Sequence, residues 1–380
     1  MIIAQHIYQD GKWTCSSDKN KYNLNNFQLA YVFGSVSLLE NENRFEEIKN
    51  LYPNADIITS STSGEIAGDQ ILEHSIVVTG IYFEKTTIKS VQKNLRNYNS
   101  SFNLGKELFE ELNKEGLAGI FLISDGQLIN GSELADGLNN QNNRFVPITG
   151  GLAGDYAKFN RTVTSLNGIP KEGNVIATGF YGKDLLVSHD HYGGWDEFGR
   201  ERVVTRSEKN VLYEIDGQSA LSLYKEYLGT YAKELPLSAL MFPLSVNIED
   251  KRGKLVRTIL SIDEENNTMT FAGNIPEGST VRLMKANFEK LINGAYKAAE
   301  RSTELMNGLK PQLSILISCV GRKLVLKQRV AEEIEAAHSA LGKETVITGF
   351  YSNGELSPIK AGDNCELHNQ TLTITSFIEL

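Results

Sequence analysis

The chain has 380 residues, a net charge of −9 and 41% hydrophobic residues. This length is enough for two domains with cores of their own. The acidic balance argues against nucleic acid as the main partner, because binding it needs a basic face. The three cysteines (Cys15, Cys319 and Cys365) include no CxxC pair and are too few for a disulfide-rich secreted scaffold. With no signal-peptide pattern and no apolar run of about 20 residues, the sequence predicts a cytoplasmic protein.

One order of elements occurs three times: a strand, a helix, a strand, a glycine-containing turn and a strand. The first copy is predicted at Leu29 to Leu39, Asn41 to Tyr52, Ala55 to Thr59 and Ser75 to Phe83. The second is predicted at Leu117 to Ser124, Gly131 to Asn139, Phe145 to Thr149 and Asn174 to Tyr181. The third is predicted at Gln312 to Ser318, Lys327 to Leu341, Thr345 to Phe350 and Thr371 to Glu379. We interpret the repetition as internal duplication, the alternative being convergence on common α/β grammar.

Between the second and third copies, short strands with turn signals indicate antiparallel pairing. They are predicted at Leu237 to Ile248, Leu255 to Ile262, Thr268 to Ala272 and Ser279 to Leu283. The polar, glycine-containing segment Asp190 to Asn210 is predicted to join the two halves of the chain. The fold class is therefore α/β of a mixed α+β kind, with crossover and antiparallel connections, sheets covered by helices, and two related halves with internal pseudo-repeats.

The turns after the second strand of each copy are candidate ligand sites, because ligands of α/β sheets usually lie at strand ends. In the first copy, hydroxyl residues lead through Gly64 to Glu65, which could hold an ammonium group. The third copy ends similarly at Gly354 and Glu355, so the two carboxylates could face one cleft, or each could cap its own turn. In the second copy, Gly150 and Gly151 precede no helical pattern, which argues against a phosphate loop.

Other side chains could also carry chemistry. Cys319 could be a nucleophile if a base such as His368 were near, but a small buried residue is favoured. Arg322 could bind a carboxylate or form a structural salt bridge. His189 and His191 would share one strand face, although no third metal ligand is evident nearby, and His191 could serve as an axial haem ligand.

With these motifs in hand, the chain resembles the FIST family of sensory proteins from about Leu24 to Ile374. Ser60 to Ile66 is similar to the family's C-S-T-A-G-E-I signature, with serine in place of cysteine, and Gly150 to Asp155 is similar to its G-G-x-A-G-D turn. His191 to Trp195 resembles its H-G-W segment with inserted residues. Further matches follow in the family's order at Leu212 to Gly217, Pro276 to Gly278, Ser318 to Arg322, Gly349 to Leu356 and His368 to Thr371.

The resemblance implies a FIST N-type domain at residues 24–210 and a FIST C-type domain at residues 211–370. It implies a sensor of a small ligand such as an amino acid. Because the chain ends directly after the last predicted strand, we expect its output through a separate partner such as a histidine kinase. Some free-standing family members are described as haem-binding nitric oxide sensors, which makes His191 the candidate haem ligand. The candidate ligand-binding residues are Ser61, Thr62, Ser63, Gly64, Glu65, Gly150, Gly151, Asp155, Cys319, Arg322, Tyr351, Gly354, Glu355, His368 and Asn369.

Three hypotheses follow. The first is a sensor without catalysis or a cofactor, in which Arg322 binds the carboxylate of an amino-acid-like ligand and Glu65 or Glu355 binds its ammonium. The ligand would lie between the two halves and shift their relative orientation. The second is a haem-based nitric oxide sensor that uses His191. The third is an enzyme that uses Cys319 or the two glutamates, but no catalytic triad can be assembled from the spacing. We prefer the first.

Overall fold

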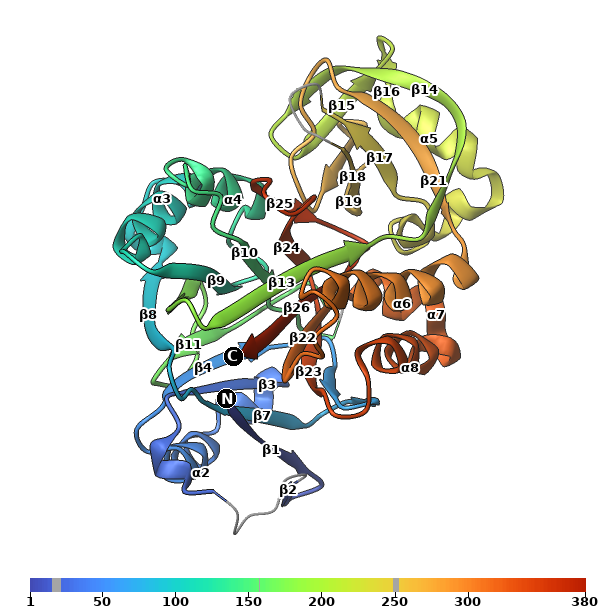
Figure 1. Cartoon of the computed structure of the whole chain (residues 1–380). Coiled ribbons are helices and arrows are strands. Elements are labelled where there is room, and N and C mark those ends of the chain that lie inside the picture. The colour runs from blue at the N-terminus through green and yellow to red at the C-terminus, as the bar shows by residue number, and fades with distance from the viewer. Residues whose placement is uncertain (16–21, 157, 249–252) are drawn as a thin grey trace.

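The structure is a computed structural model that describes residues 1–15, 22–156, 158–248 and 253–380. It consists of a body with three six-stranded sheets and a lobe built on an eight-stranded sheet (Figure 1). We call this lobe, made of the described residues between 195 and 286, the middle lobe. Both termini lie in the body, where the amino group of Met1 forms an ion pair with Glu379 (3.1 Å).

Each sheet of the body is built on one copy of the predicted repeat, here units 1, 2 and 3. In unit 1, β3 (Leu29–Gly34) is parallel to β4 (Asp56–Ser61) and antiparallel to β7 (Ile76–Tyr82). In unit 2, β9 (Leu117–Ser124) is likewise parallel to β10 (Ile148–Leu152) and antiparallel to β12 (Asn174–Tyr181). In unit 3, β22 (Leu313–Cys319) is parallel to β23 (Val346–Ser352) and antiparallel to β26 (Leu372–Glu379). The mixed fold class and the threefold repetition are therefore confirmed.

Three further strands complete each six-stranded sheet, and at least one of them comes from another unit. The edge strands are β1 (Ile2–Gln9) on β7, β8 (Thr87–Asn94) on β12 and β13 (Leu185–Tyr192) on β26, with β2 (Lys12–Cys15) beyond β1. The exchanged strands are β5 (Glu65–Ala67) on β23, β24 (Gly354–Pro358) on β10 and β11 (Thr164–Leu166) on β4. The strands β6 (Gln70–Leu72) and β25 (Cys365–His368) lie outside β5 and β24. Unit 1 therefore contributes to the sheet of unit 3, unit 3 to that of unit 2, and unit 2 to that of unit 1. These exchanges link the three units in a cycle.

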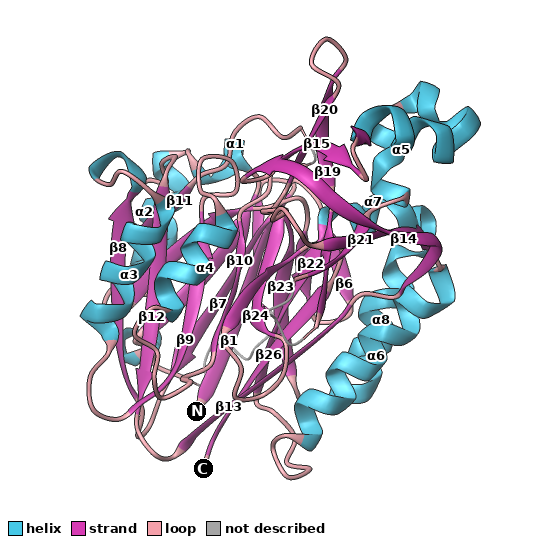
Figure 2. Ribbon diagram, turned by 90° about the horizontal axis from the view of Figure 1, so that it is seen from above, coloured by secondary structure: helices cyan, strands magenta, loops and turns pink. Residues whose placement is uncertain are grey.

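The three sheets of the body share a central core. Helices lie outside the sheets (Figures 1 and 2). The inner faces of the three sheets meet in an aromatic cluster to which Phe33, Phe121 and Phe350 contribute, one from each unit. The covering helices are α2 (Glu42–Leu51), α3 (Ser101–Leu112), α4 (Gly131–Asn139), α6 (Phe288–Glu304), α7 (Val320–Leu326) and α8 (Val330–Leu341). Shorter helical turns are α1 (Val36–Leu39), η1 (Leu24–Asn26), η2 (Leu95–Asn97) and η5 (Lys327–Arg329).

The middle lobe has a separate core of strands and one helix, including Leu212, Tyr224 and Phe271. Its strands are β14 (Trp195–Glu208), β15 (Val211–Ile215), β16 (Gln218–Ser219), β17 (Leu244–Asn247), β18 (Lys254–Arg257), β19 (Ile259–Asp263), β20 (Thr268–Phe271) and β21 (Thr280–Ala286). Its helices are α5 (Ala220–Leu228), η3 (Gly229–Glu234) and η4 (Leu237–Met241). Every pairing among its strands is antiparallel, as predicted.

In the structure, three predicted elements have a different secondary structure, and others divide or shift in their bounds, as Leu255 to Ile262 divides into β18 and β19. The run Leu29 to Leu39 is strand β3 followed by the short helix α1, because Ser35 is the N-cap of a helical turn and its carbonyl oxygen accepts from Leu39 N (3.1 Å). The run Leu237 to Ile248 is the helical turn η4 followed by β17. The segment Asp190 to Asn210 is mostly the long strand β14, whose pairing with β21 shifts register near Gly199. The β-bulge at this register shift accommodates Gly199, one of the glycines that suggested a loop.

Candidate functional site

The turns that follow β4, β10 and β23 meet near the centre of the body. In each turn, a backbone N–H bonds to a carbonyl oxygen of another unit. The three hydrogen bonds are Ser63 N to Tyr351 O (2.8 Å), Asn353 N to Leu152 O (3.1 Å) and Gly154 N to Ser61 O (3.0 Å). The structure therefore brings together predicted turn residues that are far apart in the sequence.

The turn of unit 1 is organised by Glu65, which is fully buried. Its carboxylate accepts hydrogen bonds from Thr62 Oγ1 (2.5 Å), Ser75 Oγ (2.6 Å) and the Tyr156 hydroxyl (3.0 Å). Burial raises the pKa of Glu65, and the hydrogen bonds oppose this rise. The Ser63 hydroxyl, by contrast, is buried without a hydrogen-bond partner among the described residues.

The turn of unit 3 has the same design around Glu355. The carboxyl group accepts from Ser352 Oγ (2.7 Å), Thr371 Oγ1 (2.8 Å) and Thr371 N (3.2 Å). Thr371 directly precedes β26, as Ser75 directly precedes β7. Burial raises the pKa of Glu355 to about 8, so its neutral form predominates at pH 7. Each glutamate thus binds its own turn and the start of its own antiparallel strand.

The predicted glycines lie where the backbone or a side chain passes close by. At Gly150, whose φ is +149°, a Cβ atom would lie 1.9 Å from the carbonyl oxygen of Leu122 on the neighbouring strand. A Cβ atom at the other predicted glycines would lie 2.6 Å from Ile317 Cγ2 (Gly151), 2.6 Å from Lys323 Nζ (Gly64) and 3.1 Å from Leu367 Cδ1 (Gly354). Among the described residues between β10 and β11, no helix opens after Gly151, in agreement with the sequence argument against a phosphate loop.

Arg322 is fully buried and bonded to groups inside the protein. Its guanidinium forms an ion pair with Glu333 (2.6 Å), which is also fully buried. It also donates to the carbonyl oxygens of Leu291 (2.9 Å) and Gly193. Gly193 lies in the link between β13 and β14, so Arg322 ties α6, α8 and the entry to the middle lobe together. Tyr351 joins this group, because its hydroxyl donates to Glu333 (3.3 Å).

Cys319 is buried at the end of β22. Burial raises the pKa of its thiol well above the usual value, and the nearby Glu355 adds to the rise. The thiolate is the nucleophilic form of cysteine. This environment therefore favours the small buried residue over the nucleophile, the two alternatives that the sequence left open.

Three histidines cluster where β13 passes β24 and β25. The rings of His191 and His368 have centroids 4.1 Å apart. His368 Nε2 donates to the Ser357 carbonyl oxygen (2.9 Å), and His189 Nδ1 lies 3.4 Å from the Ser357 hydroxyl. His191 Nδ1 is buried with no hydrogen-bond partner in the described part of the chain. Burial lowers the pKa of His189 and His191 to about 4, so both are neutral at pH 7.

Asn369, the remaining predicted residue, follows His368 and is buried as well. Its Nδ2 donates to the His368 carbonyl oxygen (3.0 Å), whereas its Oδ1 has no partner among the residues described. A pocket of about 470 Å³ lies beside the histidines, and we call it the histidine pocket. It is lined by His189, Asp190, His191, Arg301, Glu304, Leu305, Ile359, Lys360 and Ala361. The described residues contain no group of three His, Cys, Asp or Glu side chains that could hold a metal ion.

A second cavity separates unit 2 from the middle lobe, and we call it the lobe cleft. It has a volume of about 420 Å³, which is in the range of small-molecule sites. The body side is lined by Gly126, Gln127, Leu128, Ile129, Asn130, Leu152, Phe159 and Asn353, and the lobe side by Asn210, Leu260, Ser261, Thr270, Phe271, Ala272 and Gly273. It lies at the carboxyl ends of the parallel strands β9 and β10, where open α/β sheets bind ligands. No described residue that lines it carries a charge.

The side chain of Asn353 is the most unusual group of the lobe cleft. Both its Oδ1 and its Nδ2 are buried, and neither has a hydrogen-bond partner among the described residues. A Cβ atom at Gly126 would lie 3.2 Å from Asn353 Nδ2, so the glycine leaves space beside the amide. Buried amides are normally hydrogen-bonded, and an unpaired one in a native structure calls for a partner such as water or a ligand.

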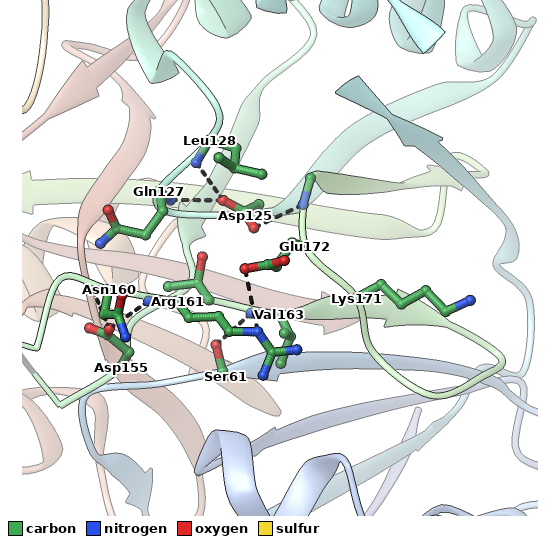
Figure 3. A network of polar contacts seen from close by, with 12 residues as sticks. Ser61, Asp125, Gln127, Leu128, Asp155, Asn160, Arg161, Val163, Lys171 and Glu172 are labelled. Carbon is green, nitrogen blue, oxygen red and sulfur yellow. Dashed lines mark hydrogen bonds and ion pairs between the residues drawn. The ribbon is translucent and has the colours of Figure 1, made fainter. Parts of the chain in front are cut away.

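Two carboxylates shape the wall of the lobe cleft (Figure 3). Asp125 accepts from the backbone N–H groups of Gln127 (2.8 Å) and Leu128 (2.7 Å), which line the cleft. Asp155, a predicted site residue, accepts from the N–H groups of Phe159 (3.0 Å) and Arg161 (3.0 Å). Both carboxylates therefore position cleft residues. In the same network, the Ser61 hydroxyl accepts from Val163 N (3.0 Å).

Sequence reasoning missed most of the lobe cleft. Asn353 stands inside a motif that the resemblance quoted, between Tyr351 and Gly354, but its amide gave no signal of its own. Asp125 follows a predicted strand directly, and this position was a usable signal. The lobe residues Leu260 and Ser261 had no such signal in the sequence, because they belong to the antiparallel sheet of the middle lobe, far along the chain from Asp125.

Comparisons with known proteins agree with these motifs. The FIST N domain model matches residues 28–218, and the FIST C domain model matches residues 220–358. The chain is 26% identical over 342 residues to an uncharacterised protein of Methanocaldococcus jannaschii. The match covers 81% of this chain and 63% of that protein's length. Among the described residues, no helix has the length and apolar character needed to cross a membrane. The chain therefore belongs to the FIST family of sensory domains, with a FIST N domain followed directly by a FIST C domain.

Proposed function

We propose that this protein is a cytoplasmic, non-catalytic sensor that binds a small ligand in the lobe cleft and signals through a separate partner, such as a histidine kinase. The observation that carries the proposal is the unpartnered amide of Asn353 in this cleft. Leaving a buried polar group unpaired costs about 1–3 kcal/mol. A ligand that completes the hydrogen bonds of Asn353 recovers this free energy.

The position of the cleft suggests how binding is transmitted. The lobe is joined to the body by the links before β14 and after β21. Beside the cleft, Asn274 of the lobe bonds to Ser132 Oγ (3.1 Å) and to Asn130 Nδ2 (3.0 Å) of the body. A ligand that contacts both walls stabilises one orientation of the lobe and so shifts the population that a partner recognises.

The matched substitution Asn353→Leu tests the proposal, because leucine keeps the approximate shape and removes both polar atoms. We expect affinity for the bound probe to fall by about 10-fold or more. We expect stability in the absence of ligand to stay equal or rise, since an unpaired polar group is removed. The probes are free leucine, leucinamide, N-acetyl-leucine and N-acetyl-leucinamide, with calorimetry and thermal unfolding as measurements.

The control for Asn353→Leu is Asn43→Leu, on the exposed face of α2. This change should leave the affinity for every probe as it is in the unchanged protein. If none of the four probes binds, or if the two variants bind equally well, the lobe cleft is not the sensory site.

A second candidate function is haem-based sensing of nitric oxide at the histidine pocket. The observation in its favour is that, of the three histidines, His191 has a buried ring nitrogen without a partner. Its neutral imidazole is the form that binds iron. Arg301 and Lys360 could pair with the haem carboxylates, and Leu305 and Ile359 offer apolar surface, so the residues fit the group. Haem would supply an iron that binds nitric oxide.

Haem titration decides this second candidate. If the pocket binds haem through His191, adding haem gives a saturable Soret band at one equivalent, and His191→Ala loses it. The control His338→Ala, on α8, should keep the band. A band that both variants share equally would show nonspecific association and rule out His191 as the ligand.

A further inference from the structure

The lobe cleft has a chemistry that narrows the class of its ligand. We infer that it selects an uncharged molecule with a carboxamide-like group for Asn353 and an apolar group for the cleft mouth. This inference deepens the proposed function and rests on it. Three features of the described residues carry it: the absence of charge in the lining, the occupied backbone donors, and the arrangement of apolar side chains.

The first feature is the lining itself. No Asp, Glu, Lys, Arg or His side chain is among the described residues that line the cleft. A charged ligand loses hydration on entry and needs an opposite charge to compensate. The side chains that the sequence assigned to the charged groups of an amino acid are bonded to other groups of the protein. Arg322 is paired with Glu333, and Glu65 and Glu355 are bonded within their own turns.

The second feature concerns anions, which often bind backbone N–H groups at loops and helix N-termini. The Gly126 N–H already donates to Thr162 Oγ1 (2.8 Å), and the next two N–H groups donate to Asp125. At the start of α4, the Asn130 side chain accepts from the N–H groups of Ser132 (3.0 Å) and Glu133 (3.1 Å). These groups are therefore not free to hold a phosphate or a carboxylate.

The third feature is the division of the cleft into polar and apolar parts. The Asn353 amide offers both an acceptor and donors, and a carboxamide complements both. On opposite walls, Leu128 and Leu260 are 51% and 39% exposed, and Phe159 lies in the same lining. An apolar group of the ligand would cover these side chains and remove their surface from water.

Leucine and three of its derivatives test the inference by charge. Within each pair, N-acetyl-leucinamide with N-acetyl-leucine and leucinamide with leucine, the shape is nearly the same and only the carboxyl end differs. N-acetyl-leucinamide is neutral, N-acetyl-leucine is an anion, leucinamide is a cation and leucine is a zwitterion near neutral pH. We expect N-acetyl-leucinamide to bind about 10-fold or more tightly than the other three. We expect Asn353→Leu to remove this preference. The variant Asn353→Asp keeps the shape, adds a negative charge and should change the preference to the cation leucinamide.

The outcomes separate this inference from the proposed function. If a charged derivative binds best and loses affinity in Asn353→Leu, the cleft is the sensory site but the inferred ligand class is wrong. If no derivative depends on Asn353, the proposed function fails together with the inference. If Asn353→Asp folds with an unchanged order of affinities, the amide does not face the ligand and the inference is overturned.

Discussion

The substitution Arg322→Ala is expected to lower the free energy of unfolding by about 3–5 kcal/mol, because it leaves a buried carboxylate without its partner. Arg322 and Glu333 are both fully buried and 2.6 Å apart. The change also removes the donors to the carbonyl oxygens of Leu291 and Gly193. Urea unfolding followed by tryptophan fluorescence would measure the loss, since Trp195 lies two residues after Gly193 and is buried.

The control for this change is Arg301→Ala. Arg301 is 57% exposed and lies 3.8 Å from Asp190, and an exposed ion pair of this kind contributes at most about 1 kcal/mol. Equal destabilisation by the two changes would refute a structural role of the buried pair. If Arg322→Ala instead folds with undiminished stability and loses affinity for free leucine, Arg322 binds the ligand carboxylate, as the sequence predicted.

The local order of elements could be predicted, because buried strands and amphipathic helices leave clear periods in the sequence. The predicted bounds of β9, β12 and α4 agree with the structure residue by residue. The exchange of β5, β24 and β11 between units could not be predicted in this way. It depends on pairings such as that of Glu65 with Phe350, whose partners are far apart in the chain.

The site could be predicted in part from its residue types. The run of hydroxyls before Gly64 and Glu65 indicates a turn with many side-chain hydrogen bonds, but hydroxyls are needed both in a ligand site and in a turn that bonds its own side chains. Only the distances, such as 2.5 Å from Thr62 Oγ1 to Glu65, show the internal bonds. Conversely, the amide of Asn353 is noteworthy because it lacks partners in three dimensions. The roles of the individual predicted ligand residues stay predictions.

The buried glutamate of unit 3 gives a test in which pH is the variable. The pKa of Glu355 is raised by burial to about 8 in the folded protein, from an ordinary value of 4.5. Between these values the folded state holds more protons than the unfolded state, so stability decreases as pH rises, by up to about 1.4 kcal/mol per pH unit. This loss of stability is absent below pH 4.5 and reaches its full size above pH 8.

Glu355→Gln is therefore expected to stabilise the protein relative to the unchanged chain by an amount that grows from about pH 5 to about pH 8 and then levels off. Glutamine is neutral at every pH and can still accept from Thr371 N and donate to the Ser352 hydroxyl. Urea unfolding at several pH values measures the difference, and titrations common to both proteins, such as that of Asp190, cancel in it. The control Glu344→Gln removes one carboxylate from the exposed surface and shows whether the pH profile needs a buried one. If Glu355→Gln gave a constant difference, Glu355 would be ionised in the folded protein, and a cation or ordered water would have to lie beside it.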